Sequence, residues 1–165
     1  MPLLRNGETF PRLLLRKLGG GTIELPDDLG GAYGAVLVYR GAWCPYCNAQ
    51  LAAFARASAR LDEAGIKVVA FSVDDEPTTA ALAAKHGVRY PIGFGANADA
   101  VSALIGAYVN REPRYLQTTG FVLAPDGTVV NAVYSSGPIG RLVPDDVAGL
   151  VAYLKSKAAG ASAAA

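Results

Sequence analysis

The stretch AVLVYRGAWCPYC, residues 35–47, carries the strongest structural signal in the chain. It opens with a continuous apolar run at residues 35–39, which is typical of a strand buried on both faces of a sheet. Pro45 suits the first position of a helix, where its missing N–H costs nothing, and this places Cys44 at the N-cap. The stretch therefore predicts a core strand, a turn, and a helix whose first turn holds both cysteines of the chain, Cys44 and Cys47.

The same alternation of strands and helices continues along the chain. Expected strands lie at residues 22–25, 66–73 and 90–94, with a closing hairpin around the Pro-Asp-Gly turn of residues 120–134. Expected helices run from residue 45 to Gly65, from 74 to 87, near 98–108 and over 145–157. Alternating strands and helices imply parallel crossovers, and the hairpin adds antiparallel strands. The prediction is an α/β protein of three layers, with a mixed central sheet and helices on both faces.

Length and charge limit the organisation and the partners. A chain of 165 residues fits one domain, expected over residues 1–157, and the alanine-rich residues 158–165 are expected to form a disordered tail. A net charge of +1 argues against nucleic acid as the main partner. No apolar run approaches the ~20 residues that span a bilayer, and basic residues interrupt the leucines of the N-terminus. These features predict a cytoplasmic protein that binds neither nucleic acid nor membrane.

The two cysteines, separated by Pro45 and Tyr46, admit three interpretations: a redox pair, half of a metal site, or a coincidence of packing. At a helix N-terminus the free N–H groups and the helix dipole favour a thiolate on Cys44. Cys47 then lies one turn away, within reach of a mixed disulfide or sulfenic acid on Cys44. A zinc site would need two more ligands, and the chain offers only His86, so any metal would have to be shared between chains. A redox pair without metal or cofactor is the leading prediction.

Four stretches resemble one known family: GETFP near the start, VLVYRGAWCPYC, VVAFSVDDE, and TTGFVLAPDGTV in the hairpin. They are similar to the redoxin branch of the thioredoxin superfamily, the AhpC/TSA or peroxiredoxin-like proteins. The resemblance implies a thioredoxin fold with an N-terminal extension and an inserted helix. It also implies an antioxidant enzyme in which Cys44 attacks and Cys47 resolves, passing through a redox-active Cys44–Cys47 disulfide.

The same resemblance implies the partners. A hydroperoxide or a protein disulfide would serve as oxidant, and a reducing dithiol protein or a low-molecular-weight thiol would serve as electron donor. Pairing of two copies into a homodimer is also typical of such proteins. The alternatives are a thiol–disulfide oxidoreductase without peroxidase activity, and a non-catalytic thioredoxin-like module that binds metal between chains.

The chain departs from the family pattern at specific positions. Where peroxiredoxins carry a proline and a Thr or Ser before the attacking cysteine, Leu37 and Gly41 stand here. The position of their active-site arginine falls near Thr118, and Thr118 and Thr119 occupy the place of the thioredoxin cis-proline. The buried acid of thioredoxins is replaced by Val38. These departures leave a peroxide and a disulfide both open as the oxidant.

Several further residues are candidates for the surroundings of the thiols. Arg40, Arg111 and Arg114 are candidate cations beside the thiolate. Trp43 is expected to pack beside Cys44, either shielding it or simply filling the core. Tyr39 and Tyr46 are expected mainly to pack, His86 to end a helix at the surface, and the acids at 74–76 to cap the next helix.

Overall fold

The computed structural model of the chain describes residues 2–164, with side chains from residue 2 to residue 161. The strands are β1 (Leu13–Lys17), β2 (Thr22–Leu25), β3 (Tyr33–Val38), β4 (Ile66–Phe71), β5 (Ile92–Phe94), β6 (Val109–Arg111), β7 (Arg114–Leu116), β8 (Thr119–Leu123) and β9 (Val129–Tyr134). The helices are the short 3-10 helix η1 (Asp27–Leu29), α1 (Pro45–Arg56), α2 (Ser58–Glu63), α3 (Glu76–His86), α4 (Ala98–Ile105) and α5 (Pro144–Ala164).

The main sheet is mixed, as predicted, and its strands follow the order β2-β1-β5-β4-β3-β8-β9. β3, β4 and β5 run parallel, whereas β8 pairs antiparallel with β3 and β1 pairs antiparallel with β5. In the register of β3 with β8, Val38 lies opposite Thr119. This pairing brings the chain around residue 117 next to the turn that follows β3, and so it assembles the site described below.

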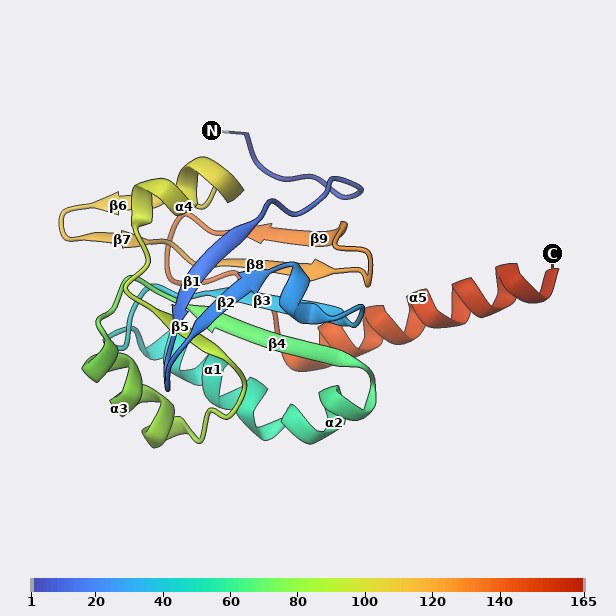
Figure 1. Ribbon diagram of the computed structural model, residues 1–165, viewed down its shortest axis with the longest axis horizontal. Coiled ribbons are helices and arrows are strands. Elements are labelled where there is room, and N and C mark those ends of the chain that lie inside the picture. The colour runs from blue at the N-terminus through green and yellow to red at the C-terminus, as the bar shows by residue number, and fades with distance from the viewer. Residues whose placement is uncertain (1, 165) are drawn as a thin grey trace.

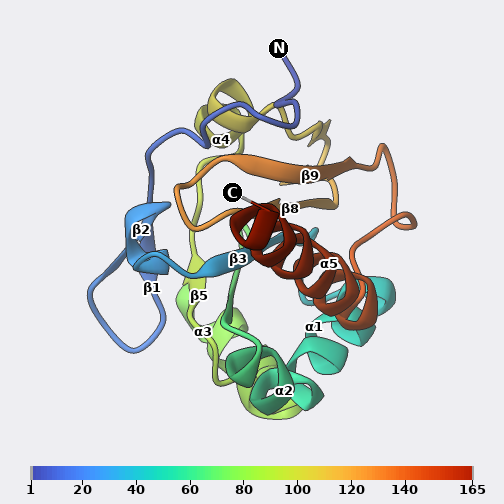
Figure 2. The same ribbon diagram turned by 90° about the vertical axis from the view of Figure 1, so that its right-hand side faces the viewer.

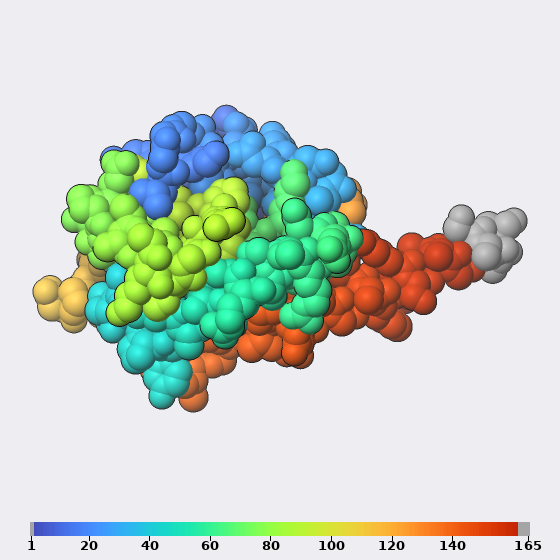
Figure 3. Space-filling model, turned by 90° about the horizontal axis from the view of Figure 1, so that it is seen from below, coloured from blue at the N-terminus to red at the C-terminus, as the bar shows by residue number. Residues whose placement is uncertain are grey.

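Helices cover both faces of the sheet (Figures 1 and 2). α4 lies on one face, and α1, α2 and α3 lie on the other. Figure 3 views the molecule from the side of α1, α2 and α3, whose atoms lie side by side on this face. The central strand β3 serves both cores, because Val36 and Val38 pack toward the α4 side and Ala35 and Leu37 toward the α1 side. The continuous apolar run at the end of β3 therefore reflects burial on both faces.

The units β3–α1–β4 and β8–β9–α5 are the two halves of a thioredoxin fold, and α3, β5 and α4 are inserted between them. The predicted fold class is confirmed. The segment before β3 forms the β1–β2 hairpin, which joins the main sheet through β5. Among residues 2–164, no helix is both long and apolar enough to cross a bilayer.

The helix after Cys44 is broken, whereas one helix as far as Gly65 was predicted. α1 ends at Arg56 and α2 begins at Ser58, with Ala57 between them. The Ser58 hydroxyl donates a hydrogen bond to the Phe54 carbonyl at 3.0 Å. Such bonding of a serine to the preceding turn bends helices, and this accounts for the break.

Two short features were not predicted from the sequence: the strand β1 and the β6–β7 hairpin. β1 was not expected, although Leu13 and Leu15 are buried and alternate with exposed neighbours as in a strand. The third helix was expected to reach residue 108, but it ends at Ile105 because Gly106 adopts a left-handed conformation with φ of +80°. The chain then forms the β6–β7 hairpin, which is separate from the main sheet.

The predicted tail is corrected in part. The final helix was expected to end at Lys157, but α5 continues to Ala164. Alanine has the highest helix propensity of all residues, so the run after Lys157 continues the helix even though it projects beyond the body of the molecule (Figure 1). Ala165 lies outside the described residues.

Candidate active site

The candidate site lies where the chain leaves β3 and begins α1. Cys44 is the N-cap of α1, with extended backbone angles, and Pro45 holds the first helical position. The Sγ atom of Cys44 accepts a hydrogen bond from the backbone N–H of Cys47 at 3.3 Å. The predicted placement of Cys44 and Pro45 is confirmed. A sulfur therefore takes the position that usually holds a capping oxygen, and there it receives the partial positive charge of the helix N-terminus.

Both cysteines are free thiols, and both are completely buried. The Cys47 sulfur accepts a hydrogen bond from the backbone N–H of Arg40 at 3.4 Å. The two thiols thus belong to one polar cluster beneath the surface. A small oxidant has easier access to such a site than a bulky one.

Arg40 is the cation beside Cys44. Its guanidinium donates to the Cys44 sulfur at 3.7 Å, to the side-chain oxygen of Gln117 at 3.0 Å and to the hydroxyl of Tyr115 at 2.9 Å. It also lies over the rings of Trp43 and Tyr115, 4.9 and 5.2 Å from their centroids. Hydrogen bonds in the plane of the guanidinium and rings against it fix the charge in one position.

This environment shifts the pKa values of the two thiols in opposite directions. Burial opposes ionisation of Cys44, but hydrogen bonds from the Cys47 thiol, the Cys47 N–H and Arg40 outweigh it and lower the Cys44 pKa. Burial and the hydrogen bond that Cys47 donates to Cys44 raise the Cys47 pKa, against the opposing effects of Arg40 and Arg141. The site therefore distinguishes one readily ionised thiol from one that keeps its proton.

The pH dependence of thiol alkylation should report this difference. Because the Cys44 pKa is lowered, iodoacetamide should label Cys44 with a rate that rises with pH and levels off below the ~8.5 of a free thiol. Labelling of Cys47, measured in parallel by mass spectrometry of peptides, should rise only at higher pH. Equal profiles for the two cysteines would contradict this assignment of the thiolate.

Arg141 is a second cation of the site that was not predicted from the sequence. It follows β9 and reaches back to donate to the side-chain oxygen of Gln50 and to the hydroxyl of Thr118, each at 2.9 Å. Gln50 in turn donates to the backbone carbonyl of Leu142 at 2.9 Å. No local sequence pattern marks Arg141, because its neighbours Gln50 and Thr118 are far away in the chain.

Asp74 supports the turn that precedes Cys44. Its carboxylate accepts a hydrogen bond from the Ala42 N–H at 2.8 Å, and the Asn48 side chain donates to the Ala42 carbonyl at 2.9 Å. The acids after β4 were predicted to be capping groups, and Asp75 does cap α3 by accepting from the Thr78 N–H. The capping prediction is thus confirmed for Asp75, whereas Asp74 holds the active turn.

Trp43 and Tyr46 lie at the surface of the site. Trp43 is 55% exposed and packs edge-on against Tyr115 with ring centroids 4.9 Å apart, so it does not fill the core. Tyr46 is 52% exposed. A Cβ atom added at Gly41 would lie 2.2 Å from the indole nitrogen of Trp43. Glycine at this position is therefore what allows the indole ring to lie over the active turn.

Thr118 and Thr119 are both buried at the start of β8. The Thr118 hydroxyl accepts the hydrogen bond from Arg141, and the Thr119 hydroxyl donates to the Gln117 carbonyl at 3.1 Å. Thr118 thus belongs to the site through Arg141. Thr119 stabilises the strand end that carries Gln117.

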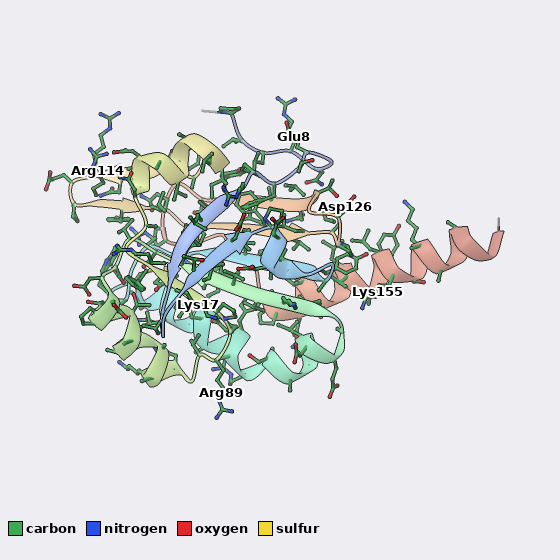
Figure 4. All side chains as sticks on the ribbon, in the orientation of Figure 1. Glu8, Lys17, Arg89, Arg114, Asp126 and Lys155 are labelled. Atoms are coloured by element: carbon green, nitrogen blue, oxygen red, sulfur yellow. The ribbon has the colours of Figure 1, made fainter. Side chains whose placement is uncertain are left out.

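The other two candidate arginines are not brought to the thiols. Arg111 is exposed on β6. Arg114 is bound to Asp99 at 2.7 Å, and Figure 4 shows its side chain pointing away from the body of the molecule. His86 lies in the last turn of α3, as predicted, with Gly87 as the C-cap. Of the three candidate cations, only Arg40 contacts Cys44.

Two thiols in the first turn of the helix that follows the central strand of a thioredoxin fold define a thiol-dependent oxidoreductase. The model of the AhpC/TSA family matches residues 6–132. This chain belongs to the AhpC/TSA family.

Relatives in this family carry peroxiredoxin names. A peroxiredoxin of Treponema denticola is 26% identical over 145 residues, which cover 86% of this chain and 68% of that protein. The 1-Cys peroxiredoxin PER1 of Hordeum vulgare is 32% identical over 111 residues, which cover 63% of this chain. The match covers 50% of the Hordeum protein, so this chain is similar to only half of that relative.

Solved structures show the same fold. AhpC of Mycobacterium bovis superposes with a TM-score of 0.81 at 20% identity, covering 95% of this chain and 96% of that one. Peroxidoxin BcpB from Mycobacterium tuberculosis gives a TM-score of 0.78 at 19% identity, covering 91% and 97%. At this level of identity the likeness concerns the fold alone.

Proposed function

We propose that this chain is a cytoplasmic thiol peroxidase that cycles Cys44 and Cys47 between a dithiol and an intramolecular disulfide. The observation that carries the proposal is the Arg40 guanidinium, fixed on the sulfur of a cysteine that caps a helix. Such preorganised donors stabilise both the attacking thiolate and the charge that develops as an O–O bond breaks.

In the first step the Cys44 thiolate attacks one oxygen of a hydroperoxide. The S–O bond forms as the O–O bond breaks, which leaves Cys44 as a sulfenic acid, and the leaving alkoxide or hydroxide takes up a proton. In the second step the Cys47 sulfur attacks the oxidised sulfur of Cys44. A disulfide forms and water is released. A dithiol protein or a low-molecular-weight thiol then reduces the disulfide and restores both thiols.

The second cysteine sets this chain apart from one of its relatives. The Hordeum relative is named a 1-Cys peroxiredoxin. Here Cys47 lies one helical turn after Cys44 and its N–H contacts the Cys44 sulfur. This proximity supports resolution within the chain, and a homodimer, typical of the family, would not be needed for it.

Disulfide exchange is the second candidate function, and Gly41 favours it. The family resemblance implies a Thr or Ser hydroxyl at this position, and here the Trp43 indole lies over a glycine instead. An exposed aromatic ring beside the thiols is the kind of surface that contacts a protein substrate. In this alternative Cys44 would attack a protein disulfide, and Cys47 would release the mixed disulfide. Metal binding between chains would show up as metal in the purified protein.

The deciding experiment is stopped-flow fluorescence of the reduced protein mixed with hydrogen peroxide. Trp43 is the only tryptophan and adjoins Cys44, so its emission should report each step. We expect a peroxide-dependent phase ~10²–10³-fold faster than free cysteine, the scale of preorganised donors, followed by a peroxide-independent phase. Cys47→Ser should retain the first phase and lose the second. A rate no faster than that of free cysteine would reject the peroxidase and leave disulfide exchange.

A further inference from the structure

The groups around Cys47 offer more hydrogen-bond donors than a neutral thiol needs as an acceptor. The Arg40 N–H points at its sulfur at 3.4 Å. The guanidinium of Arg141, held on Gln50 of the same helix, is close enough to lower the Cys47 pKa, and the Cys47 thiol itself donates to the Cys44 sulfur. With its own proton engaged by Cys44, the Cys47 sulfur accepts the Arg40 N–H and lies near the Arg141 guanidinium, yet it carries no charge to match these donors.

Arg141 is held in this position from three sides. Its terminal nitrogens donate to Gln50, to Thr118 and to the backbone carbonyl of Pro138. Gln50 lies three residues after Cys47 on α1, and therefore on the same face of that helix. A further donor, Nε of Arg141, is buried and has no hydrogen-bond partner among the described residues. A buried donor without a partner is costly, so the dithiol is not the state in which this guanidinium is fully satisfied.

Oxidation of Cys44 changes which protonation state of Cys47 is favoured. As long as Cys44 is a thiolate, it holds the proton on Cys47 by accepting its hydrogen bond. Once Cys44 has reacted, its sulfur no longer carries the negative charge that accepts this bond. The donors from Arg40 and Arg141 remain in place, and both favour the anionic form of Cys47.

We propose that Arg141 is the catalytic residue of the second step: its guanidinium stabilises the thiolate of Cys47 after Cys44 has been oxidised. The inference rests on the proposed function in one respect, the order in which Cys44 reacts first and Cys47 resolves. Cys47 loses its proton, its sulfur bonds to the Cys44 sulfur, and the group bound to Cys44 leaves. That group takes up a proton as hydroxide, to give water, or leaves as a thiolate when the oxidant was a disulfide.

This arrangement makes the two thiols reactive one after the other. The groups that face Cys47 are Cys44 on α1, Arg40 after β3, Arg141 after β9 and Tyr39 at the end of β3. The Tyr39 pKa is raised to about 12, chiefly by burial, so Tyr39 stays neutral at physiological pH. The charge that favours ionised Cys47 therefore comes from Arg141, because Arg40 reaches Cys47 through its backbone N–H and its guanidinium is bound to Cys44.

The test uses a small neutral disulfide, 2,2′-dithiodipyridine, so that it does not depend on peroxidase activity. Attack by Cys44 releases one absorbing pyridinethione, and attack by Cys47 on the mixed disulfide releases a second. In Arg141→Met the second phase should slow about tenfold at pH 7, because a higher Cys47 pKa reduces the thiolate fraction more than it raises the nucleophilicity of the thiolate. The first phase should stay within twofold. Arg141→Lys, which keeps the charge, should recover part of the second phase.

Two outcomes would overturn the proposal. One is an unchanged second phase in Arg141→Met, and the other is an equal loss in both phases, which would indicate a structural role. A measurement on the unaltered protein covers the case in which the variant does not fold. The Cys47 pKa, taken from the pH profile of the second phase, should lie below the Cys47 pKa of the reduced protein, and an equal or higher value would also reject the proposal. Failure of the peroxide reaction leaves this test intact, so the two failures are distinguishable.

Discussion

Replacing Cys44 with serine is expected to lower the rate of the reaction with hydrogen peroxide by at least about 10³-fold, to the background of the assay. The thiolate is the nucleophile, and a serine hydroxyl is not ionised near neutral pH. The helix N-terminus and Arg40 would still surround the side chain of residue 44, but no reactive anion would be there to stabilise. The measurement is the stopped-flow fluorescence of Trp43, with consumption of peroxide followed independently.

The matched control is Cys47→Ser, which removes the same chemical group one turn further along α1. It should keep the first phase, because the Cys44 N-cap position and its contact with Arg40 do not depend on the Cys47 side chain. The modified Cys44 should then be trapped by dimedone as a sulfenic acid. If Cys44→Ser retained the fast reaction and Cys47→Ser lost it, the assignment of the two roles would be reversed.

Local signals made most of the fold predictable. Three of these signals act within a few residues. They are the apolar run that becomes the end of β3, the proline that opens α1 and the Pro-Asp-Gly turn between β8 and β9. β1 was missed because an alternation of only five residues is a weak signal beside two flanking leucine clusters. β6 and β7 have three residues each, too few for a periodic pattern. The break at Ala57 depends on a single serine hydrogen bond, which composition does not reveal.

Only the part of the site that is formed by residues close together in the sequence was predictable. Cys44, Cys47 and Arg40 lie within eight consecutive residues, and their chemistry follows from one strand end and one helix start. Gln117 and Arg141 come from elsewhere in the chain, and they join the site, Gln117 on Arg40 and Arg141 on Thr118, because β8 pairs with β3. Sheet order and register cannot be read from residue types alone, and this is why the second cation was not foreseen.

Arg40→Met should slow the first step about 100-fold, the loss typical of removing one preorganised donor from a developing charge. Methionine fills similar space but supplies neither charge nor hydrogen bonds. The contact of the guanidinium with the Cys44 sulfur would be lost, together with its bonds to Gln117 and Tyr115. Because Arg40 helps to lower the Cys44 pKa, the pH profile of the first phase should also move to higher pH.

Arg111→Met is the matched control, because it removes the same charge from the exposed strand β6. Arg111→Met should leave both the rate and the pH profile unchanged. The rate of Arg40→Lys should lie between those of Arg40→Met and the unaltered protein, because an ammonium keeps the charge but not the planar fork of the guanidinium. A general effect of net charge would slow Arg111→Met as much as Arg40→Met and would contradict a specific role. The other contradicting result is a slower reaction in Arg40→Met without any shift of the pH profile. In that case Arg40 would act on the peroxide alone, and the ionisation of Cys44 would depend on the N-terminus of α1 and the thiol of Cys47.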